Sequence, residues 1–214
     1  MSDDKITLYY CPNTRAGSTR VLLEELGAPY ELVVMDMKAG EHLGEAFRAV
    51  NPMAKVPAIR HKGVVITEQV AIYLYLCDQF PEKELAPALD DPLRGAYLRW
   101  MVFYAACFEP AMVDHALKRE PGARGMVPYG DFDSVIDTLA GQVRAGPHFL
   151  GEPFTALDLL WGSAIRQMMQ WKILPERPEF TAYVARLGTR TIAARLTQEA
   201  EAMAAAQEAA RKKA

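Results

Sequence analysis

The sequence predicts an α/β domain followed by an all-helical domain, and three observations support this prediction. Short β-rich runs alternate with helical segments over the first ~80 residues, which is the pattern of an α/β layer structure. Beyond residue 92 no convincing strand appears. Between these regions, residues 80–92 (FPEKELAPALDDP) combine three prolines with several acidic residues, as a linker does. We therefore predict domains at 1–81 and 93–214, joined by a linker at 82–92.

The first domain is expected to have the order β-α-β-α-β-β-α. Gly27 follows an apolar helical run at a C-cap position, and a β-rich run begins three residues later. A strand, helix and strand of this length imply parallel pairing. His61-Lys62-Gly63 separates two short β-rich runs and predicts a hairpin. The expected strands are 5–10, 30–35, 56–59 and 64–66, and the expected helices are 18–26, 42–50 (weak) and 68–80, the last capped by Thr67.

The second domain is expected to be helical throughout. Thr155 followed by Asp158 has the spacing of a capping box at the start of a helix. The Ala/Glu-rich end from Glu199 is expected to be a solvated helix whose cations suit a helix C-terminus. Expected helices are 93–111, 132–144, 155–169, 179–186 and a last one from 189.

Composition excludes several classes of function. The net charge of −3 provides no electrostatic footprint for nucleic acid or an anionic membrane. The first residues lack the apolar run of a signal peptide, and no apolar run approaches the ~18 residues of a transmembrane helix. The three cysteines and four histidines lack metal-ligand spacing. We expect a soluble, cytoplasmic protein without a metal, nucleic-acid or membrane partner.

Lys55-Val56-Pro57 is the most informative tripeptide for ligand binding. Proline cannot donate to a sheet ladder, so a proline just ahead of a β-rich run is unusual. A cis peptide bond would turn the Val56 N–H and C=O outward, where a ligand can pair with them. The alternative is a proline on an edge strand with no ligand nearby.

Thr67-Glu68-Gln69 lies at a strand-to-helix junction. A helix N-terminus offers unpaired N–H groups and a positive dipole that can hold a carboxylate, while Glu68 can hold an ammonium. Together they would suit the end of a zwitterionic amino acid. The alternative is a capping threonine followed by an ordinary first turn.

The segment from Tyr9 to Ser18 is rich in hydroxyl and amide groups where the first helix starts. A thiol placed there would meet hydrogen-bond donors, the helix dipole and the charge of Arg15. Free thiols have a pKa near ~8.5, and lowering it by about two units requires roughly 2.7 kcal/mol.

Five segments, taken in order, resemble a glutathione transferase: KITLYY, STRVLLEELG, NPMAKVPAI, TEQVAIYLYL and DQFPEKELAP. GEPFTALD, at 151–158, extends the resemblance into the second domain. The likeness spans residues 6–190 and is greatest to bacterial, beta-class-like members. It implies a thioredoxin-like first domain with Pro57 in cis. Glutathione would be the co-substrate, and a homodimer the assembly.

The resemblance also implies roles for individual residues in glutathione binding. The Val56 main chain would pair with the cysteinyl part of glutathione like an added strand. Glu68 and Gln69 would hold the γ-glutamyl end, although the family commonly has Ser or Thr in place of Gln69. Lys55, with Lys38 as a further candidate, would approach the glycyl carboxylate.

The residue that activates the thiol stays open among several candidates. Arg15 falls where beta-class members have their active-site cysteine, and Cys11 lies four residues too early. Asn13 falls where other bacterial members have a threonine that approaches the thiol. In decreasing order of preference, the candidates are Asn13 and Thr14, then Tyr9, with Arg15 as electrostatic support, and last Cys11 and Ser18.

We expect the protein to conjugate the glutathione thiolate to small hydrophobic electrophiles in a cleft between the domains, as in detoxification. Tyr104 and Phe108 are candidates for the electrophile pocket, although aromatic residues at this spacing also suit a helix core. The first alternative is a non-catalytic binding or stress-response module of the same fold. The second is a glutathione-dependent isomerase or peroxidase.

Overall fold

The computed structural model describes residues 4–188 and 190–213, which form two compact units. The first unit comprises residues 4–83 together with 190–213, and the second comprises 84–188. The boundary falls inside the predicted linker, after the 3₁₀ turn η2 (Pro81–Lys83). Among the described helices, none combines the length and the apolar character needed to cross a membrane.

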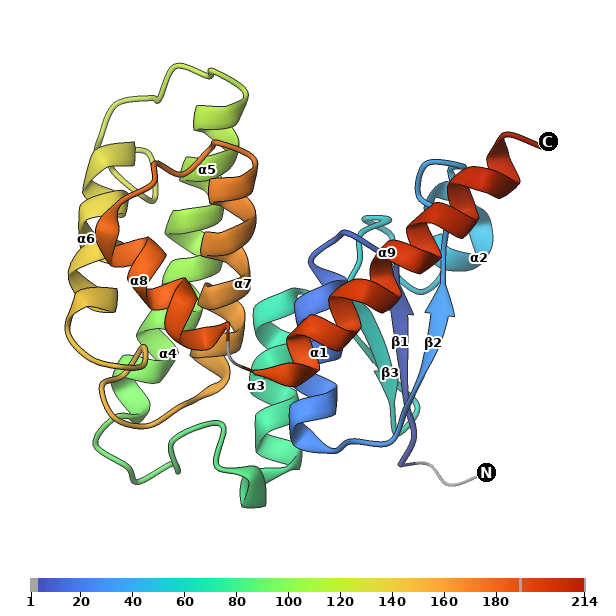
Figure 1. The fold of residues 1–214 in the computed structure, drawn as a ribbon, viewed down its shortest axis with the longest axis horizontal. Helices are drawn as coiled ribbons and strands as arrows, with labels where there is room; N and C mark the ends of the chain where they lie inside the picture. The colour runs from blue at the N-terminus through green and yellow to red at the C-terminus, as the bar shows by residue number, and fades with distance from the viewer. Residues whose placement is uncertain (1–3, 189, 214) are drawn as a thin grey trace. The chain divides into compact units, whose positions relative to one another are not determined.

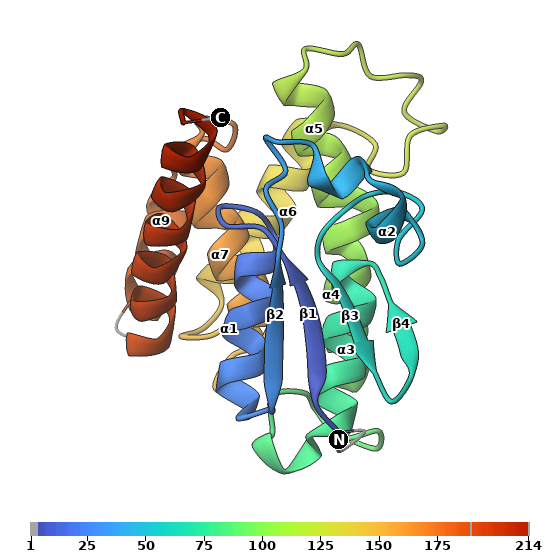
Figure 2. The same cartoon turned by 90° about the vertical axis from the view of Figure 1, so that its right-hand side faces the viewer.

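The first unit is built on four strands, β1 (Ile6–Tyr10), β2 (Tyr30–Val34), β3 (Ala58–His61) and β4 (Val64–Ile66). They form one mixed sheet in the order β2-β1-β3-β4 (Figure 2). β1 pairs with β2 in parallel, as the strand-helix-strand spacing predicts, and β1 also pairs with β3 antiparallel. β3 and β4 form the predicted hairpin, which turns through Lys62 and Gly63 at positive φ. The predicted thioredoxin-like α/β layer is confirmed.

Helices α1 (Ala16–Leu26) and α3 (Gln69–Gln79) pack against each other and against the sheet, while η1 (Glu41–Leu43) and the short α2 (Glu45–Arg48) follow β2. Gly27 closes α1 in the left-handed region with φ 62°, as predicted. Thr67 does not cap α3, because the N-cap position is occupied by Glu68.

The last helix, α9 (Thr191–Arg211), runs along α1 within the first unit (Figures 1 and 2). Leu196 and Ala200, one turn apart, are buried. The prediction grouped this helix with residues 93–214, whereas the structure places it in the first unit. From Glu199 on, the helix is mostly exposed, as expected, although Ala200 is buried. Charged side chains of α1 supply partners for this helix that the tail's own composition does not reveal.

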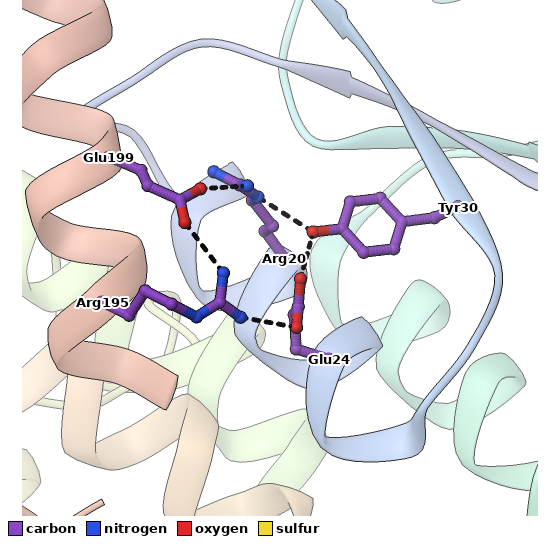
Figure 3. Close-up of polar contacts among 5 residues, drawn as sticks. All are labelled: Arg20, Glu24, Tyr30, Arg195 and Glu199. Carbon is purple, nitrogen blue, oxygen red and sulfur yellow. Dashed lines mark hydrogen bonds and ion pairs between the residues drawn. The ribbon is translucent and has the colours of Figure 1, made fainter. Parts of the chain in front are cut away.

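Five charged and polar side chains join α9 to α1 and β2 (Figure 3). Arg20, only 7% exposed, donates to Glu199 (2.5 Å) and to the Tyr30 hydroxyl (3.1 Å). Arg195 donates to both Glu24 (2.7 Å) and Glu199 (2.8 Å). Burial disfavours the charged form of Arg20, but the hydrogen bonds to Tyr30 and Glu199 outweigh it and raise the pKa of Arg20. The carboxylate that α9 brings offsets part of the cost of burying the guanidinium, whose Nη1 atom is buried without a hydrogen-bond partner among the described residues.

The second unit consists of α4 (Arg94–Phe103), the π-helical turn η3 (Tyr104–Phe108), α5 (Glu109–Ala116), α6 (Phe132–Arg144), α7 (Ala156–Gln170) and α8 (Pro178–Leu187). The first three form one helical run, longer than the predicted helix. Pro110 explains the π turn, because proline lacks an N–H and clashes with the carbonyl four residues earlier. Trp161 is fully buried, and the rings of Trp100, Phe108 and Phe149 surround it.

The predicted capping box at the start of α7 is present. Thr155 is the N-cap residue, and the Asp158 carboxylate accepts its backbone N–H (2.9 Å). The other carboxylate oxygen accepts the N–H of Phe149 (2.7 Å) and the hydroxyl of Tyr183 (2.9 Å). One buried side chain therefore ties α7 to α8 and to the chain before it.

Replacing Glu199 by alanine tests the buried charge. We expect the free energy of unfolding to fall by about 2 kcal/mol, because the buried Arg20 guanidinium loses its carboxylate. The control is Glu201→Ala, an exposed glutamate of the same helix, which should change the unfolding free energy by less than ~0.5 kcal/mol. Urea unfolding measures both variants, and equal losses would contradict the proposed role of Glu199.

The same contacts predict that the free energy of unfolding depends on pH. Hydrogen bonds from Arg20 and Arg195 hold the pKa of Glu199 below its usual value. Such a carboxylate stabilises the fold above its unfolded pKa of ~4.3, and the stabilisation disappears as the pH falls through the lower folded pKa. The stability difference between wild type and Glu199→Ala should therefore be full at neutral pH and shrink below about pH 4. A difference that stays constant in urea titrations down to pH 3 would contradict this.

Candidate functional site

Loop segments far apart in the sequence meet at one end of the sheet. β1 and β4 end there and β3 begins there, because β3 is antiparallel to both. The Gln69 amide nitrogen at the start of α3 lies 2.6 Å from the Ser18 hydroxyl and 3.4 Å from the Arg15 carbonyl oxygen in α1 and the turn before it. The end of the sheet thus gathers three segments that the sequence analysis selected separately: 11–15, 51–57 and 67–69.

The turn before α1 presents Asn13 and Arg15 to solvent. Asn13 has φ 59°, a left-handed conformation that asparagine tolerates better than most residues. The Thr14 hydroxyl donates to the carbonyl of Cys11 (2.7 Å) and accepts the N–H of Ala16 (3.3 Å). Because a hydroxyl has one proton, Thr14 would have to release Cys11 before it could donate to a thiolate.

Cys11 and Tyr9 are less suited to activate a thiol. Burial raises the pKa of the Cys11 thiol, and its sulfur lies 3.6 Å from the carbonyl oxygen of Pro12. The ring of Tyr9 packs on Phe47 at a centroid distance of 5.5 Å. Its neighbour Tyr10 contacts Arg20 of α1, so strand alternation puts Tyr9 on the opposite face of the sheet from α1.

The loop before β3 is anchored by Asn51. This side chain is 3% exposed, donates to the carbonyl of Lys55 (2.8 Å) and accepts the N–H of Met53 (3.0 Å). The Val56–Pro57 peptide bond is cis. The sheet ladder begins at Ala58, and within residues 4–188 and 190–213 the main chain of Val56 forms no hydrogen bond. The loop therefore presents one donor and one acceptor at a fixed edge.

The junction before α3 carries backbone strain. Glu68 is exposed and has φ 63° and ψ 113°, outside the favoured regions for a non-glycine residue. A conformation of this kind costs of order 1–3 kcal/mol and persists where the surroundings impose it, often at functional sites. Neither α1 nor α3 has an acidic residue in its first turn, and both helices direct their positive N-terminal ends toward this region, with the Glu68 carboxylate at the N-cap of α3.

The remaining candidates lie in the second unit. Tyr104 and Phe108 are 3% and 0% exposed, and their rings contact Trp161 at centroid distances of 5.2 and 5.0 Å. Both belong to the core of that unit, and contact of either with an electrophile stays a prediction. Within the described ranges, no group of three or more metal-ligating side chains lies close enough together to hold a metal ion.

Sequence reasoning missed the anchoring roles of Asn51 and Ser18. An asparagine before a proline is a turn signal, and this signal did not reveal the contact with Lys55 four residues later. Ser18 was a late candidate for catalysis. In the structure its hydroxyl donates to the Arg15 carbonyl (3.0 Å) and accepts from Gln69, which ties α1 to α3.

Two variants compare the buried Asn51, which anchors a loop, with the exposed Asn13. Asn51→Ala should lower the free energy of unfolding by about 2 kcal/mol, because a buried amide loses two hydrogen bonds. Asn13→Gly removes an exposed amide and suits the positive φ, so it should change stability by less than ~0.5 kcal/mol. Urea unfolding of both variants is the measurement. A loss in Asn13→Gly as large as in Asn51→Ala would contradict these assignments.

Comparisons with known proteins bear on this site. Residues 4–78 match the family model described as glutathione S-transferase, N-terminal domain. The chain is 26% identical over 178 residues to a glutathione S-transferase of Hyoscyamus muticus, covering 76% of this chain and 83% of that protein.

Solved structures agree over nearly the whole chain. A glutathione transferase from Methylococcus capsulatus superposes with a TM-score of 0.78 and 26% identity, covering 92% of this chain and 98% of the other. A sphingomonad glutathione S-transferase, solved in complex with glutathione, has a TM-score of 0.73 and 25% identity, with 91% and 98% covered. With the mixed sheet and the helical second unit, these likenesses show that the chain belongs to the glutathione S-transferase superfamily.

Proposed function

We propose that this protein is a glutathione transferase that binds glutathione where the turn 11–15, the loop 55–57 and the start of α3 meet. The enzyme then directs the glutathione thiolate onto a small hydrophobic electrophile. The observation that carries the proposal is the unpaired Val56 main chain, which lies at the end of the sheet to which two helix N-termini point. The sphingomonad relative solved with glutathione supports the choice of ligand.

Each part of glutathione has a matching group in this region. The Val56 N–H and C=O pair with the cysteinyl residue as an added strand would. The exposed Glu68 carboxylate attracts the γ-glutamyl ammonium, and the first-turn N–H groups of α3, beginning at Gln69, donate to the neighbouring carboxylate. Lys55, also exposed, is charged oppositely to the glycyl carboxylate. The ligand is thus recognised by complementary charge at both of its ends.

Asn13 is our first choice for the group that stabilises the thiolate. Its amide is exposed at the turn before α1, whereas the Thr14 proton is already donated to Cys11. One hydrogen bond to a charged sulfur, the dipole of α1 and the charge of Arg15 together supply the roughly 2.7 kcal/mol that a two-unit shift of the thiol pKa requires. Catalysis then comes from thiolate stabilisation and proximity and needs no protein nucleophile.

Asn13→Gly tests this assignment without adding backbone strain. We expect kcat/KM for chloro-dinitrobenzene to fall about 10- to 100-fold, because a hydrogen bond to a charged group contributes ~1.5–3 kcal/mol. The pKa of the bound thiol, followed by thiolate absorbance, should rise by about one unit.

Thr14→Val is the companion variant, because it keeps the side-chain shape and removes the hydroxyl. It should leave the thiol pKa closer to the wild-type value than Asn13→Gly does. A larger effect in Thr14→Val would transfer the role to Thr14. Wild-type kinetics in both variants would exclude the turn as the activating element.

The two alternative functions make different predictions for the same assays. A binding module would bind glutathione saturably without turnover of any electrophile. A peroxidase that used a protein thiol would need a reactive cysteine in the turn, and Cys11 is buried with a raised pKa. The homodimer, the cytoplasmic location, the role in detoxification and the contact of Tyr104 and Phe108 with the electrophile remain predictions from the resemblance.

A further inference from the structure

The C-terminal end of α9 contacts the segment that follows β2. Gln207 donates from its side-chain amide to the carbonyl of Met35 (3.1 Å). One turn later, the Arg211 guanidinium forms an ion pair with the Asp36 carboxylate. These contacts are separate from the cluster of Figure 3, which lies nearer the start of the helix. α9 is therefore attached to the first unit at two places.

Asp36 organises the segment that α9 holds. Its carboxylate accepts hydrogen bonds from the N–H groups of Lys38 (3.0 Å) and Ala39 (3.1 Å). The backbone N–H of Asp36 donates to the carboxylate of Glu41 (2.6 Å). Burial disfavours the Asp36 carboxylate, but the contacts with Arg211 and with the amides of Ala39 and Lys38 outweigh it and lower the pKa of Asp36. The ion pair with Arg211 therefore helps to keep a folded turn in place.

This segment is joined directly to the turn that carries the candidate catalytic residues. The N–H of Met35 donates to the carbonyl of Tyr10 (2.8 Å), and the main chain of Met37 partly offsets the burial that raises the pKa of the Cys11 thiol. Cys11 in turn accepts the Thr14 hydroxyl at its carbonyl. A continuous series of contacts thus leads from Arg211 to the residues beside Asn13.

We propose that Gln207 and Arg211 are positioning residues: they hold the segment 35–39 in place and so fix the turn 11–15 against which the glutathione thiol lies. The proposal rests on the proposed function for the identity of the ligand. It makes the far end of the chain part of the scaffold of the site. Lys38, a candidate for the glycyl carboxylate, lies within the segment that Arg211 and Asp36 fix.

The test compares Arg211→Ala with Lys212→Ala. Both variants remove one cation from the same helical turn, but the partner of Lys212 is Glu208 on the same exposed helix surface. Arg211→Lys, which keeps the charge, is the conservative variant. All three changes lie at the end of a helix, so the midpoint of urea unfolding should stay near that of wild type.

The first measurement does not depend on glutathione. In Arg211→Ala, we expect amide hydrogen exchange of Lys38 and Ala39 and peptide-resolved alkylation of Cys11 to accelerate about fivefold, which corresponds to ~1 kcal/mol of lost coupling. Lys212→Ala should exchange and react like wild type, and Arg211→Lys should recover most of the protection. Equal behaviour of Arg211→Ala and Lys212→Ala would overturn the proposal.

The second measurement is steady-state kinetics with glutathione. We expect KM for glutathione to rise about fivefold in Arg211→Ala with a smaller change in kcat, and Arg211→Lys to recover it. An unchanged KM with accelerated exchange would overturn the link to the site. If wild type binds no glutathione, the proposed function fails, and the exchange comparison still decides whether α9 fixes the turn.

Discussion

The buried guanidinium of Arg20 is the interaction on which the first unit depends most. It stands on α1, contacts the Tyr10 ring of β1 and donates to Tyr30 of β2 and Glu199 of α9. An arginine in this position is tolerated only when acceptors surround it, because an unpaired buried charge is far costlier than a paired one. The same charge therefore fixes the position of α1 on the sheet and requires that α9 dock.

Because α1 is held in this way, the turn at its N-terminus has a rigid base. Asn13 and Glu68 both adopt positive φ values, and Asn51 fixes the loop that leads to Val56. These strained or irregular segments lie at the ends of regular elements that are themselves well packed. A binding site needs this combination, since groups must be held close to the productive geometry before the ligand arrives.

The sequence predicted the parts of the fold that depend on local chemistry. The parallel β1–β2 unit, the Gly27 C-cap, the hairpin at Lys62-Gly63 and the capping box of Asp158 all follow from turn and cap residues with one conformational preference. The family resemblance was needed to select Val56, Glu68 and Gln69 as a glutathione site. The local sequence alone gave greater weight to an edge-strand proline and an ordinary capped helix.

Contacts between segments that are far apart in the sequence could not be predicted from local sequence patterns. The docking of α9 depends on a pairing of Arg20 with Glu199 across 179 positions, which no periodicity encodes. Thr67 was expected as a cap, but the strained backbone of Glu68 moves the start of the helix by one residue. The hydrogen bond of Thr14 to Cys11, which favours Asn13 as the thiol's partner, depends on the geometry of the folded turn.

Titration calorimetry of reduced glutathione with wild type and Glu68→Gln tests the central claim most directly, because this exchange keeps the side-chain shape and removes only the charge. The glutathione site described here predicts saturable binding of one ligand per chain to wild type. Affinity should fall about tenfold in the variant, or ~1.4 kcal/mol, with unchanged unfolding. No heat of binding in wild type, or equal affinity in the two proteins, would contradict the site.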